Sequence, residues 1–470
     1  MPSMKYKGRP SFGDTGPLVV TVTDIAMPGD EGVAKADDFV VFVPGTIPGD
    51  RVAIRIIRRE KRYGYGEVVA VQEPSPYRIE APCPHFGICG GCTIQSMDYA
   101  KQLEIKGSHL KQSLKRLGGI DVAGNRFGEI TPSPLTYFYR SKIELAFGSD
   151  GSRIIAGMRE SASPGGRVRP GVVPVPDCRI FSPVLREILE VIEEHIHSEG
   201  LFPYDERAKR GTLRHLILRE SKSTGNIMVI IETKGDEDHA MGELYDRLQK
   251  AVPRVTSLWR AISNRPGSYI DYSHLRHEGG ERFIEEALAG LTLNVYPASF
   301  LQPNPAGAAL LYEEIGRIAG SRQYGNILGL YCGMAPIELL LSRNAQKVTG
   351  IDSLKGNIEN ARENASINSI TNCSFHAGKV EDIVMDRGFK KPDLIIIDPP
   401  RSGLSGRGMG LLTALMPATL IYVSCNPATL ARDLGRLITA GYSLERVAPF
   451  DLFPHTSHLE TLTVLKRKGK

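Results

Sequence analysis

Apolar runs of strand length alternate with helical segments from about residue 290 to the end of the chain. Three of these runs, 327–331, 393–397 and 420–424, lead into polar or reactive side chains. Such an alternation predicts an α/β fold with a mainly parallel sheet that helices cover on both faces. Ligands and chemistry in open α/β folds gather at the carboxyl edge of the sheet. The residues that follow these runs are therefore the first candidates for a functional site.

The first run and the strand expected at 347–351 have the spacing of a nucleoside site. A glycine turn at Gly333 follows the first run, and Asp352 comes 19 residues later at the tip of the second strand. An acid at that tip can accept hydrogen bonds from a ribose. An ordinary strand–helix–strand unit is the alternative.

The other two runs lead into the segment 398–401 (DPPR) and into Cys425. Asp-Pro-Pro after an apolar strand resembles motif IV of S-adenosylmethionine-dependent methyltransferases, although most amino-group methyltransferases of nucleic acids have an aromatic residue where Arg401 stands. Cys425 precedes a predicted helix whose dipole favours a thiolate, so it is a candidate nucleophile. A small buried core cysteine is the alternative.

A segment rich in histidine, 455–460 (HTSHLE), precedes the last apolar strand. Its Glu460 is a candidate general base, and a surface acid is the alternative. Zinc binding by His455 and His458 lacks a third ligand nearby, so we discount it.

The N-terminal part of the chain predicts a small β-barrel, because β-branched runs at 18–23, 39–43, 51–57 and 67–71 are separated by Gly and Pro turns. The net charge of +5 is too small to indicate a nucleic-acid partner by itself. However, basic residues cluster in 51–62 and two tyrosines follow them. Charges for phosphates and rings for bases suit RNA binding. A solvated hairpin tip is the alternative.

The chain has 7 cysteines, and three of them, Cys83, Cys89 and Cys92, lie close together. Cys178 follows after a further 86 residues. Cys-x-x-Cys presents two thiolates to one metal ion or cluster. The polar start of the chain lacks the apolar core of a secretory signal, so we expect metal binding or catalysis rather than a disulfide framework.

Four ordered motifs together resemble the RNA 5-methyluridine methyltransferase family, and within it the bacterial 23S ribosomal RNA uracil-C5 enzymes. The motifs are 300–304 (FLQPN), 398–404 (DPPRSGL), 424–427 (SCNP) and 455–460 (HTSHLE). The resemblance covers nearly the whole chain, because 18–72 is similar to the N-terminal TRAM domain of that family, an oligonucleotide-binding-like barrel.

The resemblance implies a Rossmann-like class I methyltransferase domain that uses S-adenosylmethionine. It implies that the thiolate of Cys425 adds to C6 of a uracil in RNA, so that C5 becomes a nucleophile toward the methyl group. Glu460 would then remove the C5 proton, and the thiolate would leave. The target base must leave its stack, which costs least in single-stranded RNA.

The resemblance also implies the roles of further residues. Those that match positions around the cofactor are Gln302, Tyr331, Asp352 and Asp398, of which Asp398 would also hydrogen-bond the uracil. Phe300 matches an aromatic beside the active site. The further residues expected on the RNA side are Arg140 and, from the basic cluster in 51–62, Arg58, Arg59 and Arg62. Those that match the four ligands of a [4Fe–4S] cluster are Cys83, Cys89, Cys92 and Cys178. Zinc held by four cysteines is the competing metal.

The chain departs from the family pattern around the cofactor. Gly329 stands where the family usually has an aspartate, and Ala335 and Pro336 replace a glycine and a small polar residue. Three alternatives stay open: a transfer RNA substrate, an amino-group methyltransferase built around 398–400, and a non-catalytic iron–sulfur RNA-binding protein with a degenerate cofactor site.

These observations divide the 470 residues into roughly three domains after a polar tail. The expected boundaries are 1–17 for the tail, 18–75 for the barrel, 76–290 for an α+β middle domain with the cluster, and 291–470 for the catalytic domain, on which a helix at 96–119 would pack. No run approaches the roughly 18 apolar residues of a membrane span. We therefore expect a cytoplasmic monomer that binds RNA and no membrane.

Overall fold

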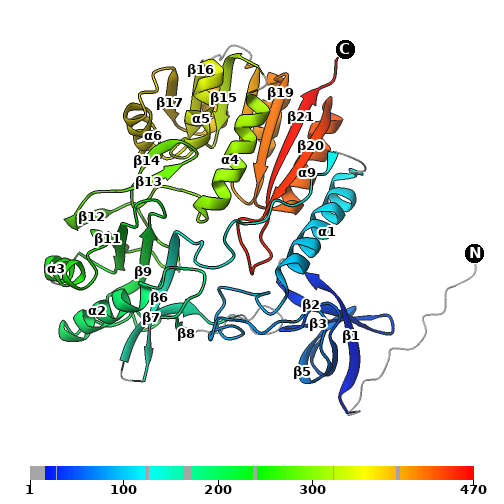
Figure 1. The fold of residues 1–470 in the computed structure, drawn as a ribbon, viewed down its shortest axis with the longest axis vertical. Helices are drawn as coiled ribbons and strands as arrows, with labels where there is room; N and C mark the ends of the chain where they lie inside the picture. Colours follow the sequence, from blue (N-terminus) through cyan, green and yellow to red (C-terminus); the bar gives the residue numbers. More distant parts are fainter. Residues whose placement is uncertain are drawn as a thin grey trace, which may run out of the picture.

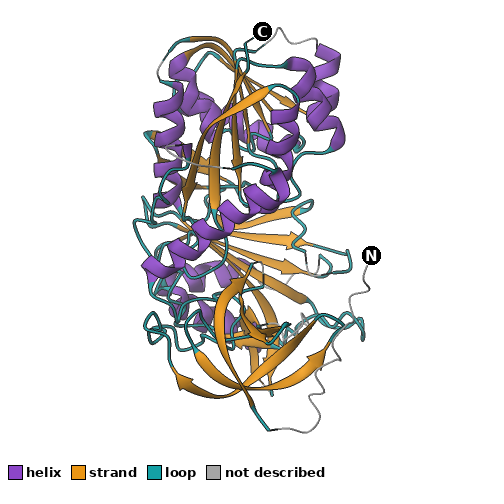
Figure 2. Ribbon diagram, turned by 90° about the vertical axis from the view of Figure 1, so that its right-hand side faces the viewer, coloured by secondary structure: helices purple, strands orange, loops and turns teal. Residues whose placement is uncertain are grey.

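The computed structural model describes residues 16–27, 29–121, 126–151, 153–161, 171–236, 241–267, 269–320, 322–387 and 392–469, so most of the expected polar tail lies outside the described residues. A closed barrel and two seven-stranded sheets follow one another along the chain (Figures 1 and 2). In Figure 1 the barrel (blue) and the middle sheet (green) lie below the C-terminal sheet (yellow to red). None of the helices in the described residues is long and apolar enough to cross a membrane.

The barrel closes in the order β1-β2-β3-β5-β4. Its strands are β1 (Leu18–Ala26), β2 (Glu31–Ala36), β3 (Phe39–Val43), β4 (Arg51–Arg59) and β5 (Tyr63–Glu73). The strand β2 is absent from the sequence-based expectation. Its buried positions are Gly32, Ala34 and Ala36, because larger side chains from β1 and β3 already fill the interior. A run of small residues gives no β-branched signal, and this explains the omission.

The middle sheet has the order β12-β11-β10-β9-β6-β7-β8. Its strands are β6 (Lys142–Asp150), β7 (Arg153–Arg159), β8 (Val172–Pro174), β9 (Leu213–Glu220), β10 (Ile227–Thr233), β11 (Val255–Ile262) and β12 (Leu275–Gly280). Its helices are α2 (Leu185–Ser198) and α3 (Met241–Ala251). Along β10, Val229 packs with these helices, whereas Met228 and Ile230 join the core of the C-terminal part. Both faces of this sheet are therefore covered.

The C-terminal sheet has the order β17-β16-β15-β18-β19-β21-β20, and only β21 runs antiparallel to its neighbours. Its strands are β15 (Tyr324–Leu330), β16 (Ala345–Asp352), β17 (Cys373–Ala377), β18 (Leu394–Ile397), β19 (Thr419–Ser424), β20 (Tyr442–Phe450) and β21 (Glu460–Arg467). Alternate residues of β18 face opposite sides, since Ile395 and Ile396 belong to different cores. The predicted mainly parallel α/β sheet is confirmed.

Helices cover both faces of this sheet. They are α4 (Pro305–Ala319), α5 (Pro336–Leu341), α6 (Lys355–Ile367), α7 (Val380–Arg387), α8 (Gly406–Leu415) and α9 (Pro427–Thr439), with a 3₁₀ turn η2 at Ser342–Asn344. The hairpin of β13 (Ile284–Leu288) and β14 (Leu291–Val295) packs in the same core as α4. This hairpin continues across residue 290, where the composition of the sequence changes.

The helix α1 (Tyr99–Gly118) leaves the N-terminal half and packs on α9 (Figure 1). It begins three residues later than the segment 96–119, because Asp98 caps its N-terminus and accepts hydrogen bonds from the backbone N–H groups of Ala100 and Lys101. Leu110 and Leu114 are buried against the C-terminal sheet, but Leu117 is 58% exposed. The apolar side chains of α1 therefore continue about one turn past the part of the helix that is buried against the sheet.

Candidate active site

A cavity of about 680 Å³ opens at the carboxyl edge of the C-terminal sheet, where β15, β16, β18 and β19 end. Parallel strands bring these ends together although they lie far apart in the sequence. The cavity gathers every catalytic and cofactor residue of the sequence analysis and two of the expected RNA residues. These lining residues are Cys425, Glu460, Gln302, Tyr331, Asp352, Asp398, Phe300 and Arg140.

The turn after β19 fixes the position of Cys425. Asn426 caps α9, since its Oδ1 accepts from the backbone N–H of Ala428 at 3.0 Å, and its Nδ2 donates to the carbonyl of Arg401 at 3.0 Å. Pro427 occupies the first helical turn, where no amide donor is needed. The SCNP sequence therefore ties the cysteine turn to the segment that follows Asp398.

Burial dominates the electrostatics of the reacting groups. It raises the pKa of Asp398 to about 7, and it raises the pKa of Glu460 well above its usual value, with the nearby Asp398 adding to the effect. Burial raises the pKa of the Cys425 thiol to about 11, and the carboxyls of Glu460 and Asp398 reinforce this shift. A hydrogen bond and the positive charge of Arg401 act in the opposite direction on the pKa of Cys425.

Glu460 begins β21 directly after the segment 451–459. Its Oε1 is buried and has no hydrogen-bond partner among the described residues. A buried carboxyl oxygen without a partner costs free energy. Glu460 also lines the cavity, so a ligand bound there can reach it.

The segment 451–459 is held from the N-terminal half of the chain. Lys106 of α1 forms a fully buried ion pair with Asp451 at 2.8 Å and also donates to the carbonyl of Phe453. Gln102 accepts from the backbone N–H of His455, whose φ of 68° is left-handed. Side chains of α1 therefore hold the backbone of this segment at Phe453 and His455.

The cofactor side of the cavity is built on Asp352 and the turn after β15. Asp352 Oδ2 accepts from the backbone N–H of Gly333 at 3.1 Å, and its Oδ1 accepts from Asn357 Nδ2 at 3.1 Å. Tyr331 and Ala335 both have left-handed backbone conformations, with φ of 62° and 66°. A glycine would adopt this conformation without strain, so the replacement by Ala335 is strained but accommodated.

Three expected RNA residues lie on the barrel and do not line this cavity. Arg58 pairs with Glu60 at 2.7 Å and lies over the ring of Tyr65, and Arg59 lies over the ring of Phe39. Arg62, the third of these residues, is exposed in the turn between β4 and β5.

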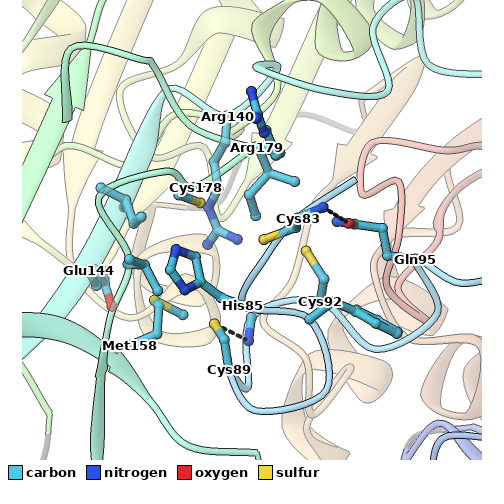
Figure 3. Close-up of a pocket in the computed structure, with 15 residues that line it drawn as sticks. Cys83, His85, Cys89, Cys92, Gln95, Arg140, Glu144, Met158, Cys178 and Arg179 are labelled. Atoms are coloured by element: carbon cyan, nitrogen blue, oxygen red, sulfur yellow. Dashed lines mark hydrogen bonds between the residues drawn. The ribbon is translucent and has the colours of Figure 1, made fainter. Parts of the chain in front are cut away.

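The four cysteines of the proposed cluster line a second cavity, of about 160 Å³, in the middle part of the molecule. Figure 3 shows the sulfur atoms of Cys83, Cys89, Cys92 and Cys178 arranged around this space. Within the described ranges, no three His, Cys, Asp or Glu side chains lie close enough to hold one metal ion. Arg140 lines both this cavity and the one at the sheet edge.

Sequence reasoning missed two charged residues of the sheet-edge cavity. Arg401 was given no role from the sequence and was noted only because it stands where most amino-group methyltransferases have an aromatic residue. That difference could have indicated that Arg401 lies in the site. Glu338 lies in an apolar helical stretch, PIELLL, where an acid reads as a solvent-facing residue. Its burial depends on how α5 packs against β15, which no local pattern encodes.

Comparison with known proteins identifies related families and relatives of this chain. Residues 290–468 match the tRNA (uracil-5-)-methyltransferase family, and residues 18–69 match the TRAM domain. An uncharacterized RNA methyltransferase of Halalkalibacterium halodurans is 33% identical over 455 residues, which cover 96% of this chain and 97% of the other. One from Clostridium tetani is 34% identical over 442 residues, or 93% and 95% of the two chains.

The chain belongs to the RNA uracil-5-methyltransferase family. Its structure resembles that of the Pyrococcus abyssi tRNA (uracil-54, C5)-methyltransferase in complex with S-adenosyl-L-homocysteine, with a TM-score of 0.72 and 27% identity over 95% of this chain and 100% of that one. The predicted family, the α/β methyltransferase fold with an N-terminal barrel and the class of enzyme are confirmed. The protein is an S-adenosylmethionine-dependent RNA methyltransferase.

Proposed function

We propose that this enzyme methylates C5 of a uridine in 23S ribosomal RNA through a covalent adduct with Cys425, and that it carries a [4Fe–4S] cluster. The observation that carries the first part is the convergence of Cys425, Glu460 and Asp398 with the cofactor residues in one cavity. Addition requires a thiol, and proton removal requires a carboxyl. Cys425 supplies the first and Glu460, whose buried Oε1 has no hydrogen-bond partner among the described residues, supplies the second.

Residues that line the cavity supply both the nucleophile and the proton acceptor of the proposed reaction. The thiolate of Cys425 forms a bond to C6, and electron density moves to C5 and the C4 carbonyl. S-adenosylmethionine, when bound, supplies an electrophilic methyl group. After methylation, Glu460 takes the proton from C5, the C6–S bond breaks, and Cys425 is released as thiolate. Asp398 is placed to hydrogen-bond the polar edge of the uracil.

Arg401 and Glu460 have opposite effects on the nucleophile. The guanidinium of Arg401 favours the thiolate and a deprotonated Glu460, whereas each carboxylate raises the pKa of Cys425. The thiolate fraction increases as the pH rises toward the pKa of Cys425. Methyl transfer should therefore increase with pH from the neutral range upward.

The barrel supplies a surface for the rest of the RNA. Tyr63, Tyr65 and Phe42 form a cluster of rings with centroids 5.6 to 5.9 Å apart, and Arg58 lies over Tyr65. Rings stack on unpaired bases, and arginines bind phosphates. Transfer RNA is the second candidate substrate, because the similar Pyrococcus abyssi enzyme acts on it.

The cysteine cavity favours a cluster over a single zinc ion. Four thiolates around one zinc lie about 2.3 Å from it. The four thiols here line one cavity of about 160 Å³, larger than a single ion needs. Burial raises the pKa of Cys89 to about 11 and also raises that of Cys92 and Cys178, so a cation is needed to hold them as thiolates. A [4Fe–4S] cluster supplies that charge and fills the space.

The test is methyl transfer from labelled S-adenosylmethionine to 23S ribosomal RNA and, in parallel, to transfer RNA. We expect 5-methyluridine by mass spectrometry in the ribosomal RNA, loss of product to background for Cys425→Ala, and a denaturation-resistant protein–RNA adduct for Glu460→Gln. Cys373→Ser, at a cysteine outside the cavity, is the control. Full activity of Cys425→Ala would contradict the covalent mechanism, and label in transfer RNA alone would contradict the ribosomal substrate.

A further inference from the structure

Glu338 is a buried acid on the cofactor side of the active-site cavity. It lies in the first turn of α5, is only 3% exposed and lines the cavity together with Asp352 and Tyr331. Its side chain has no ion pair with a basic residue anywhere in the described structure, and its own backbone N–H is the donor that lowers its pKa. Neither the family comparison nor the covalent mechanism uses this carboxyl.

The carboxyl of Glu338 occupies the space beside Gly329 of β15. A Cβ atom at Gly329 would lie 2.0 Å from Glu338 Oε1 and 2.6 Å from its Cδ, whereas real Cβ contacts are essentially never under 3.0 Å. A side chain at position 329 and the present conformation of Glu338 therefore exclude each other. The resemblance described above implies an aspartate at this strand position, whereas the acid here comes from the helix α5, and Gly329 leaves room for it.

A carboxyl in this position is costly unless something compensates its charge. Burial raises the pKa of Glu338 to about 8, and the nearby Asp398 and Asp352 reinforce the shift. Removing an unpaired carboxylate from water is strongly unfavourable. Apart from its own backbone N–H, the carboxyl meets no basic side chain among the described residues, and because it borders a ligand cavity it gains most from a cationic ligand.

We propose that Glu338 binds the α-ammonium group of the methionine part of S-adenosylmethionine, in place of an acid at position 329. The ammonium carries both the positive charge and the N–H donors that a buried carboxylate needs. The sulfonium has charge but no N–H to donate. The inference rests on the proposed use of this cavity for the methyl donor and names the residue that compensates the departure at Gly329.

The first test measures binding by calorimetry. S-adenosylmethionine and S-adenosylhomocysteine share the ammonium, but only the former has the sulfonium. We expect Glu338→Gln to weaken both by a similar factor, about 10- to 150-fold for the loss of one charged hydrogen bond. Unchanged binding would overturn the proposal, and so would a loss confined to S-adenosylmethionine, because that would assign Glu338 to the sulfonium.

The second test moves the acid back to the strand. Gly329→Asp alone and Glu338→Ala alone should each bind the donor poorly, the first because of the collision and the second because the carboxylate is gone. The double variant Gly329→Asp/Glu338→Ala removes the collision and restores an acid, so it should bind more tightly than either single variant. If the double variant bound S-adenosylmethionine no more tightly than the weaker of the two single variants, the inference that an acid at 329 and Glu338 occupy the same space would be overturned.

Two readouts separate this role from a structural one. Without ligand and near neutral pH, Glu338→Gln should unfold at the same temperature as the wild type, because burial raises the pKa of Glu338 to about 8 and a neutral amide then replaces a mostly neutral acid. A lowered unfolding temperature in step with the loss of binding would instead assign Glu338 to the fold. If the wild type itself bound no S-adenosylmethionine, the proposed function would fail, whereas equal binding by wild type and Glu338→Gln defeats only this inference.

Discussion

At the residue scale, the reactivity of Cys425 is a balance between burial and one guanidinium. Burial and the neighbouring carboxyls raise the pKa of the thiol, and Arg401 opposes them. Arg401 also lies 3.2 Å from Nε2 of His458, whose own pKa is lowered to about 4 by burial and by that positive charge. His458 is therefore neutral at physiological pH and adds no positive charge beside the nucleophile.

We predict opposite pKa shifts at Cys425 for two charge-removing variants. Arg401→Gln removes a cation and should raise the pKa of the thiol, whereas Glu460→Gln removes an anion and should lower it, each by about one pH unit or more. The measurement is the rate of iodoacetamide modification of the Cys425 peptide as a function of pH, read by mass spectrometry without RNA. Shifts in the same direction for both variants would contradict the charge balance.

At the element scale, the docking of α1 on α9 depends on two glycines. A Cβ at Gly118 would lie 2.6 Å from the carbonyl oxygen of Ala431, and one at Gly435 would lie 2.8 Å from that of Gly118. Both obstacles are backbone atoms, which cannot rotate aside. The close approach lets Leu110 and Leu114 of α1 reach the core of the C-terminal sheet.

We predict that Gly435→Ala lowers the free energy of unfolding by about 1 to 3 kcal/mol through overpacking, although alanine is the better helix former. The matched control is Gly410→Ala on α8, where a Cβ meets nothing within 4 Å. That variant should gain about 0.5 to 1 kcal/mol from helix propensity alone. Chemical denaturation followed by circular dichroism measures both, and a stabilised Gly435→Ala would mean that the helices separate without cost.

At the scale of the whole molecule, the cysteine cavity and the catalytic segment are joined. The backbone N–H groups of Thr93 and Ile94, directly after Cys92, donate to the carbonyl of His455 at 2.9 and 3.1 Å. Arg140 borders both cavities, and Lys106 of α1 holds Asp451. A disturbance among the cysteines therefore reaches the segment that positions Glu460 through direct hydrogen bonds.

We predict that Cys92→Ser lowers the iron and sulfide content of anaerobically purified protein from about four of each per chain and lowers methyl transfer with it. Activity should fall because the Thr93 and Ile94 contacts to His455 loosen. Cys373→Ser should retain wild-type iron. Iron content unchanged in Cys92→Ser, or zinc in place of iron in the wild type, would contradict the cluster.

Several residues of the candidate active site were accessible from the sequence because they end or follow a strand at the same sheet edge. Cys425, Asp398 and Asp352 could be placed together once the strands were recognised as parallel, and the structure gathers them in one cavity. The strand β2 was missed because Gly32, Ala34 and Ala36 carry no strand signal. Near the end of the helix expected at 96–119, Leu117 is exposed, because the buried face of α1 ends about one turn earlier at Leu114.

The sequence by itself determined the α/β fold, the family and the set of reactive side chains, because local periodicity and short motifs specify strands, helices and the residues at their ends. Only the tertiary structure decided which charges these side chains face. These charges come together only when separate elements pack against one another. Arg401 lies near Cys425, Lys106 pairs with Asp451, and Glu338 fills the space beside Gly329. Electrostatic energies depend on distance and burial, and neither is set until the core has formed.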